Sequence, residues 1–182
     1  FTCEKGQGLA RVKRGCYDNK QEKYPTTGDR VVIDWQGKDH SLILTTLPRT
    51  SALSRLDSAK GKEQMIAANF DYVFILQSLN GDFNIRRLER YLTLAWQSGG
   101  MPIVLLTKAD QMDNYLEQIR AAREVALGTE VHAVSVKTGE GISALNHYLS
   151  PNKTIVLVGS SGVGKSTLIN YLLGKEIMET QE

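Results

Sequence analysis

The sequence predicts an α/β fold in which a parallel sheet is covered by helices on both faces and is preceded by a small all-β module. After Asp71, continuous apolar runs alternate with helical stretches four times in succession, which is typical of strand–helix units in a parallel sheet. The segment before Leu47 instead contains short β-branched and aromatic runs separated by turn residues. Residues 49–69, between the two patterns, are rich in small polar residues and indicate a linker.

Residues 1–48 are predicted to form the all-β module. Its two clearest strands are Val31–Trp35 and Leu42–Leu47, separated by a turn over Gln36–Asp39. We expect a further strand over Leu9–Val12 and interpret the module as a barrel that lacks at least its first strand. In the linker over 49–69 we expect little buried surface, with a short helix near Glu63–Ala68.

Residues 70–182 are predicted to form the α/β domain. Its strands are expected at four apolar runs, namely Tyr72–Leu76, Ile103–Leu106, Val131–Val134 and Thr154–Val158. Its helices are expected in the intervening segments and after the last strand, at 85–98, 114–127, 142–149 and 165–174. In the first helix, apolar residues recur on one face that should pack on the sheet: Ile85, Leu88, Leu92, Ala95 and Trp96.

Composition excludes several classes of protein. A hydrophobic fraction of 41% and a charged fraction of 23% are those of an ordinary soluble globular protein. No apolar run approaches the roughly 20 residues that cross a bilayer, so we expect no membrane partner and a cytoplasmic location. The two cysteines, Cys3 and Cys16, lack metal-site spacing and are expected to be reduced thiols. Because the chain starts at Phe1, we expect the natural N-terminus to lie upstream.

Charge is unevenly distributed along the chain. Residues 1–55 contain six acidic side chains against ten basic ones, which are Lys5, Arg11, Lys13, Arg14, Lys20, Lys23, Arg30, Lys38, Arg49 and Arg55. The remaining residues contain twelve basic and fourteen acidic side chains. A basic first segment on a mildly acidic body suggests a polyanion partner. A solvated surface with scattered lysines explains the same charges, and on charge alone that alternative stays open.

Gly159–Ser166 matches the phosphate-binding pattern G-x-x-x-x-G-K-S/T at every fixed position. It lies between a predicted strand and a predicted helix, where glycines let backbone N–H groups surround phosphate oxygens beside the positive helix terminus. We expect phosphate contacts from Gly159, Ser160, Ser161, Gly162, Val163, Gly164, Lys165, Ser166 and Thr167. Lys165 should stabilise charge on the outer phosphates as the catalytic group of this loop, and Ser166 should bind Mg²⁺. The alternative is a glycine-rich turn without a ligand.

Two further segments follow the second and third predicted strands, at the sheet edge where α/β proteins bind ligands. The first contains Thr107, Lys108 and Asp110, and the second contains Ser135, Val136 and Lys137. One carboxylate can accept hydrogen bonds from both N1–H and N2–H₂ of guanine, which suits Asp110, and adenine offers no such pair of donors. The Lys108 stem can lie along the purine, and the Val136 N–H can reach guanine O6. Each segment alone is a weak signal, but together with the phosphate loop they predict a guanine nucleotide site.

These three motifs resemble those of GTPases in a rotated order, because the base-reading segments precede the phosphate loop. The chain is similar to the circularly permuted GTPases and specifically to the ribosome small-subunit-dependent GTPase A family. The resemblance extends over the whole chain, through Gly28–Val31, Ile66–Asp71, Asp82–Leu92 and Gly159–Asn170. It implies that residues 1–48 are an oligonucleotide-binding (OB) type barrel and that residues 70–182 are a circularly permuted GTPase domain.

The resemblance also implies function. The family binds GTP and GDP with Mg²⁺ and hydrolyses GTP in late maturation of the small ribosomal subunit, whose rRNA the basic barrel would grip. Exposed aromatics such as Tyr17, Tyr24 or Trp35 would assist, with Trp35 favoured as a core residue. We further expect a monomer.

Two departures from the family pattern stand out. Thr107 occupies a position where most GTPases have Asn, which puts a contact to guanine N7 in question. The switch segments, the catalytic histidine and the zinc domain of the family are expected beyond Glu182, so Zn²⁺ is expected only in that absent domain. His40, His132 and His147 are interpreted as ordinary surface or strand residues.

Two other functions compete with the GTPase prediction. A nucleotide-gated RNA-binding module with negligible hydrolysis has the same motifs, and it is favoured if the switch segments are absent. An ATP-using P-loop enzyme also has the phosphate loop, but it would require Asp110 to be incidental.

Overall fold

The computed structural model describes residues 1–13, 15–17, 24–57 and 61–180. The chain divides into two compact units, Phe1–Asn69 and Phe70–Glu182. Within the described residues, no helix is long and apolar enough to cross a membrane.

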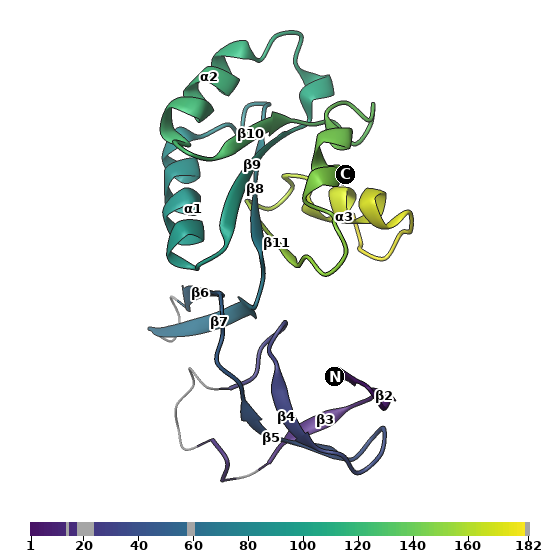
Figure 1. Ribbon diagram of the computed structural model, residues 1–182. Helices are drawn as coiled ribbons and strands as arrows, with labels where there is room; N and C mark the ends of the chain where they lie inside the picture. The colour runs from purple at the N-terminus through teal and green to yellow at the C-terminus, as the bar shows by residue number, and fades with distance from the viewer. Residues whose placement is uncertain (14, 18–23, 58–60, 181–182) are drawn as a thin grey trace. The chain divides into compact units, whose positions relative to one another are not determined.

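The second unit is built on a four-stranded parallel sheet, as predicted. Its strands are β8 (Tyr72–Ser78), β9 (Met101–Thr107), β10 (Glu130–Ala133) and β11 (Ile155–Val158). They lie in the order β10-β9-β8-β11. The last strand in sequence therefore lies beside the first, and their carboxyl ends bring distant parts of the chain to one edge (Figure 1).

Helices cover both faces of this sheet. On one face lie α1 (Ile85–Gln97) and α2 (Leu116–Val125), where α1 contacts β8 and β9. On the other lie α3 (Lys165–Leu173) and the 3₁₀ helix η3 (Ile142–His147) (Figure 1). Alternate residues of the central strands, such as Phe74 and Leu76, join a buried cluster with Leu145 and Leu168. Because side chains alternate along a strand, Val73 and Ile75 face the other way and are also fully buried.

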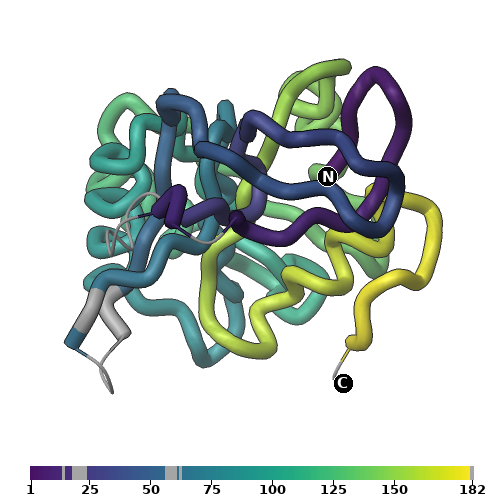
Figure 2. Tube along the Cα trace, turned by 90° about the horizontal axis from the view of Figure 1, so that it is seen from below, coloured from purple at the N-terminus to yellow at the C-terminus, as the bar shows by residue number. Residues whose placement is uncertain are grey.

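Two details of this unit differ from the sequence-based expectation. The helix expected over 142–149 is the 3₁₀ helix η3, which follows Gly141 in the left-handed conformation. Trp96, expected on the buried face of α1, is 51% exposed, whereas Leu88, Leu92 and Ala95 are buried. Each helical residue turns by about 100°, so the residue after Ala95 is carried away from the sheet. The chain after α3 folds back beside that helix (Figure 2), where the Asn170 amide donates to the Met178 carbonyl at 2.8 Å.

In its described residues, the first unit consists of short strands in three sheets. The strands β3 (Ala10–Val12), β4 (Val31–Asp34) and β5 (Ser41–Thr46) form one sheet in the order β3-β5-β4, close to the predicted strands. The strands β1 (Thr2–Cys3) and β2 (Gly6–Gln7) pair with each other. The interpretation of residues 1–48 as an OB-type barrel stays a prediction.

The prediction of a short helix near Glu63–Ala68 was wrong. That segment is strand β7 (Lys62–Ala68), which pairs antiparallel with β6 (Ala52–Asp57). The expectation of little buried surface between 49 and 69 was also wrong, because Leu53 and Ala68 are almost fully buried. Glu, Gln, Met and Ala favour helices locally, but pairing with β6 and burial outweigh that weak preference.

Candidate guanine nucleotide site

The predicted phosphate-binding residues lie together at the carboxyl edge of the sheet. Gly159–Gly164 form the turn between β11 and α3, and Lys165, Ser166 and Thr167 form the first turn of that helix. The adjacent strand is β8, one of the two central strands of the sheet. The N–H groups of the first helical turn have no partners within the helix, which makes such a turn suited to an anion.

Two glycines fix the path of this loop. A Cβ at Gly159, whose φ is 156°, would lie 2.7 Å from the carbonyl oxygen of Leu76, so only glycine lets the chain leave β11 so close to β8. Gly164 caps α3 with a φ of 101°, a left-handed conformation that other residues adopt at a cost. The backbone can therefore turn sharply enough to surround a small anion.

The ammonium group of Lys165 lies over the loop. Its Nζ donates to the carbonyl oxygens of Gly159 at 2.9 Å and Ser160 at 2.6 Å. Burial lowers the pKa of Lys165, because part of its hydration is lost. Among the described residues Lys165 forms no ion pair, so its charge is balanced by carbonyl dipoles alone. A negatively charged phosphate would restore the stabilisation that burial removes.

A buried hydrogen bond joins the phosphate loop to the end of β9. The Thr107 hydroxyl donates to the carbonyl oxygen of Val163 at 2.7 Å, and both residues are buried. From the sequence, a contact from this threonine to guanine N7 was in question. In the structure its hydroxyl instead bonds to the backbone of Val163, which lies in the middle of the phosphate loop.

Asp110 and Ser135, from the two predicted base-reading segments, are in direct contact. The fully buried Ser135 hydroxyl donates to Asp110 Oδ1 at 2.5 Å and accepts from the Thr138 N–H at 3.2 Å. Asp110 lies in the short 3₁₀ helix η2 (Ala109–Gln111), which follows Lys108 in the left-handed conformation. The backbone of the two segments is linked as well, because Ala109 N–H donates to the Val134 carbonyl at 3.2 Å.

The other two residues of the second segment have different environments. Val136 is half-buried and packs against the core cluster, whereas Lys137 is exposed. Thr107 is the last residue of β9. The other predicted residues follow β9 and β10 at the carboxyl edge of the sheet, where the phosphate loop also lies, namely Lys108, Asp110, Ser135, Val136 and Lys137.

Several contacts at this edge were not anticipated from the sequence. The Ser160 hydroxyl in the phosphate loop donates to Asp82 Oδ2 at 3.0 Å, and Arg87 forms an ion pair with the same carboxylate at 2.9 Å. The Arg87 guanidinium and the Ser160 hydroxyl lower the pKa of Asp82. Asp82 follows the end of β8 by four residues, and in the sequence it had been noted only as the first residue of the stretch Asp82–Leu92 that resembles the family.

A second unanticipated contact joins two residues that follow the base-reading segments in sequence. The Tyr115 hydroxyl donates to the Glu140 carboxylate, which raises the pKa of Tyr115. Neither residue belongs to a motif, so the sequence contained no signal for this pair.

Metal-binding capacity is small. Among the described residues, no group of three or more His, Cys, Asp or Glu side chains could hold a metal ion. Ser166, predicted to bind Mg²⁺, lies half-buried in the first turn of α3. A single hydroxyl suits Mg²⁺ that takes its remaining ligands from phosphates and water. Both cysteines are free, and the Zn²⁺ expected in a further domain stays a prediction.

The aromatics proposed to contact RNA differ in exposure. Tyr17 is buried, Tyr24 is 44% exposed, and Trp35 is half-buried with its ring edge-on to Phe1. Of the basic residues in the first segment, Arg49 is held by Asp29 at 2.7 Å. Arg14, Lys20 and Lys23 lie outside the described residues.

Comparisons with known proteins agree on one family. A family model described as RsgA GTPase matches residues 46–182. Small ribosomal subunit biogenesis GTPase RsgA 1 of Listeria innocua is 45% identical over 180 residues, which are 98% of this chain and 51% of the relative. The chain thus spans about half the length of the curated relatives it matches.

Two solved structures share the fold. The crystal structure of YjeQ from Thermotoga maritima has a TM-score of 0.72 at 25% identity, and the match covers 93% of this chain and 58% of that one. The structure of YloQ, titled a circularly permuted GTPase, has a TM-score of 0.59 at 26% identity and covers 87% and 54%. The circularly permuted GTPase-like fold predicted from the order of the motifs is therefore confirmed.

Proposed function

The chain belongs to the RsgA GTPase family, and we propose that it binds guanine nucleotides and hydrolyses GTP to GDP and phosphate during late maturation of the small ribosomal subunit. The observation that carries this proposal is the meeting of the phosphate loop and both base-reading segments at one sheet edge. Thr107 supports a single continuous site, because its hydroxyl bonds to the Val163 carbonyl within the loop at 2.7 Å.

Guanine recognition is assigned to Asp110. Its carboxylate would accept hydrogen bonds from N1–H and N2–H₂ of the base, and the Ser135 hydroxyl, 2.5 Å away, would hold it in place. The stem of Lys108 would lie along the purine ring, and the N–H of Val136 would reach O6. Lys137, which is exposed, would close the outer side of the base site.

The phosphate groups are assigned to the loop and to the first turn of α3. Lys165 would exchange its carbonyl contacts for the outer phosphates and stabilise the charge that develops on them during hydrolysis. Ser166 would supply a hydroxyl ligand to a Mg²⁺ ion, which neutralises phosphate charge when bound. The remaining residues of the loop would donate N–H groups to phosphate oxygens.

The small ribosomal subunit is proposed as the partner because the curated relatives are named small ribosomal subunit biogenesis GTPases. The basic residues of the first 55 positions would contact its rRNA, with the exposed Tyr24 available for stacking. We further propose that the chain acts as a cytoplasmic monomer.

The substitution Asp110→Asn tests the base assignment. An amide cannot accept both guanine donors, so we expect GTP affinity to fall about 100-fold, which corresponds to about 2.7 kcal/mol. Xanthosine triphosphate, which has a carbonyl in place of the N2 donor, should gain affinity. The measurement is competition against a fluorescent nucleotide with GTP, ATP and xanthosine triphosphate. The matched control is Asp113→Asn, an exposed aspartate three residues along the chain.

Unchanged GTP affinity in Asp110→Asn would refute the base assignment and favour the ATP-using alternative. Hydrolysis is tested separately, by phosphate release with and without purified small ribosomal subunits. If the chain binds nucleotide but releases no phosphate under either condition, an RNA-binding module with negligible hydrolysis is the better description.

A further inference from the structure

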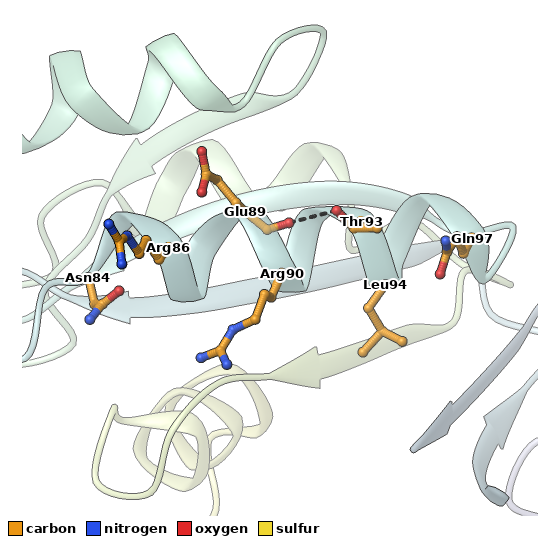
Figure 3. Close-up of a pocket in the computed structure, with 7 residues that line it drawn as sticks. All are labelled: Asn84, Arg86, Glu89, Arg90, Thr93, Leu94 and Gln97. Atoms are coloured by element: carbon orange, nitrogen blue, oxygen red, sulfur yellow. Dashed lines mark hydrogen bonds between the residues drawn. The ribbon is translucent and has the colours of Figure 1, made fainter. Parts of the chain in front are cut away.

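A shallow groove of about 790 Å³ runs along an exposed face of α1. Its lining comes from successive turns of this helix (Figure 3), namely Asn84, Arg86, Glu89, Arg90, Thr93, Leu94 and Gln97. We propose that this face of α1, which we call the arginine face, is a docking surface for the sugar–phosphate backbone of RNA, through Arg86 and Arg90. The inference rests on the proposed function, which names an RNA-containing partner.

The two arginines have charges that the described part of the chain leaves uncompensated. Arg86 and Arg90 are exposed, and neither forms an ion pair with another described residue. Arg87, between them, differs because its guanidinium is held by Asp82 at 2.9 Å. Glu89 is the one acidic residue lining the groove, and its carboxylate extends to the opposite side of the helix from the Arg90 guanidinium (Figure 3).

The position of these charges in α1 is unfavourable for the helix itself. The first turn of α1 contains no acidic residue, although the positive end of a helix favours acidic side chains and disfavours arginine. Arg86 lies in that turn, and Arg90 lies one turn further along the same face. A polyanion bound along this face would compensate both guanidinium groups.

The remaining groups of the groove favour a backbone over a base. The Asn84 Oδ1 accepts from the Arg87 N–H at 3.0 Å, and the Thr93 hydroxyl donates to the Glu89 carbonyl at 2.9 Å. The Asn84 Oδ1 and the Thr93 hydroxyl are therefore already engaged, and the two planar guanidinium forks are the charged donors of the groove. Such forks match phosphate oxygens in pairs. No aromatic residue lines the groove to stack on a base, so the surface should bind RNA without sequence preference.

The test is a double substitution, Arg86→Gln with Arg90→Gln, in the full chain. Binding to deproteinised small-subunit rRNA and to intact small subunits is measured over a range of salt concentrations. Because two phosphate contacts are lost, we expect affinity for both to fall about tenfold and the slope of log K against log salt to decrease by about 1.5. Arg86→Lys with Arg90→Lys keeps the charges and should keep most of the salt dependence.

The matched control is Arg120→Gln with Arg123→Gln, which removes the same charge from the exposed face of α2 and should leave both quantities nearly unchanged. Equal loss in the two double variants, or no loss in Arg86→Gln with Arg90→Gln, would overturn the proposal. Loss with intact subunits alone would also overturn it, in favour of a ribosomal protein partner. GDP affinity, measured on the same samples, should be unchanged. A wild-type chain without GDP affinity would refute the proposed function, while the rRNA measurement would still decide this inference.

Discussion

The lysine and aspartate side chains considered at the two edges of the parallel sheet are held in different ways. At the amino edge, charged groups are paired within the protein, because Asp71 accepts from Lys153 Nζ at 2.8 Å and from the Thr154 N–H at 2.9 Å. At the carboxyl edge, Lys165 contacts two carbonyl oxygens and Asp110 accepts from one hydroxyl. The pair at the amino edge neutralises its own charges. The carboxyl edge also contains the ion pair of Arg87 with Asp82, but Lys165 and Asp110 are held in position by neutral groups.

This difference indicates which edge can bind a charged ligand. A lysine already paired with a carboxylate gains little from a phosphate, whereas a partly buried lysine among carbonyl groups gains an opposite charge. A carboxylate held by one hydroxyl likewise keeps lone pairs for further donors. The same strands contribute to both edges, so the contrast arises from the loops. At the carboxyl edge, glycines such as Gly159 and Gly164 bring the backbone close to the site.

The largest expected effect comes from replacing Lys165 with alanine, and replacing Lys153 with alanine is the matched control. We expect Lys165→Ala to weaken GTP and GDP binding by about 100-fold or more, because a charge-assisted contact to phosphate is lost. Lys153→Ala, at the amino edge, should leave both affinities unchanged. Titration calorimetry with GDP measures both variants. Equal effects of the two substitutions would break the comparison, since a general loss of positive charge would then explain them.

A smaller effect is expected from Thr107→Val, which keeps the shape of the side chain and removes its hydroxyl. The buried Val163 carbonyl then loses its donor, which should lower the free energy of unfolding by about 1 to 3 kcal/mol. Nucleotide affinity should fall about tenfold or less, because the loop is held less firmly while its own contacts remain. Urea unfolding and GDP titration measure the two effects, and Thr107→Ser should restore both. Wild-type stability in Thr107→Val would show that the hydrogen bond to Val163 does not hold the loop.

The parallel sheet was predictable because each strand is a continuous apolar run buried on both faces. The same physics could not identify β7, whose residues favour a helix until β6 pairs with them. It also could not distinguish η3 from an α-helix, because Ile142 and Leu145 are three residues apart and fit both kinds of helix.

The site was predictable where a motif imposes backbone geometry. Gly159–Ser166 and the segments around Asp110 and Ser135 were placed at the correct ends of strands from the sequence alone. Hydrogen bonds from a side chain to a residue distant in sequence were not predictable, because neither partner is distinctive by itself. Ser160 with Asp82 is one example, and Thr107 with Val163 is another.

The smallest expected effect on the nucleotide site comes from Tyr148, which packs on Tyr72 and Phe74 away from the loops. Burial, assisted by the Glu130 carboxylate, raises the pKa of Tyr148 to about 12. The Tyr148 hydroxyl ionises near pH 10 in the unfolded chain and near pH 12 in the folded chain. The neutral tyrosine therefore contributes stability that is complete below pH 10 and is lost as the pH rises to 12. The full loss should amount to about 2 to 3 kcal/mol, of which about half is reached at about pH 11.

Tyr148→Phe should remove this alkaline loss while leaving GDP affinity at neutral pH unchanged. The measurement is the free energy of unfolding in urea at pH 8 and at pH 11, with Tyr171→Phe, an exposed tyrosine, as the control. At pH 8 the variant should be slightly less stable than the wild type, because the hydroxyl lies 3.0 Å from His132 Nε2. A fall in GDP affinity in Tyr148→Phe would contradict the separation between the two edges, since this residue could then affect the loops only through the sheet itself.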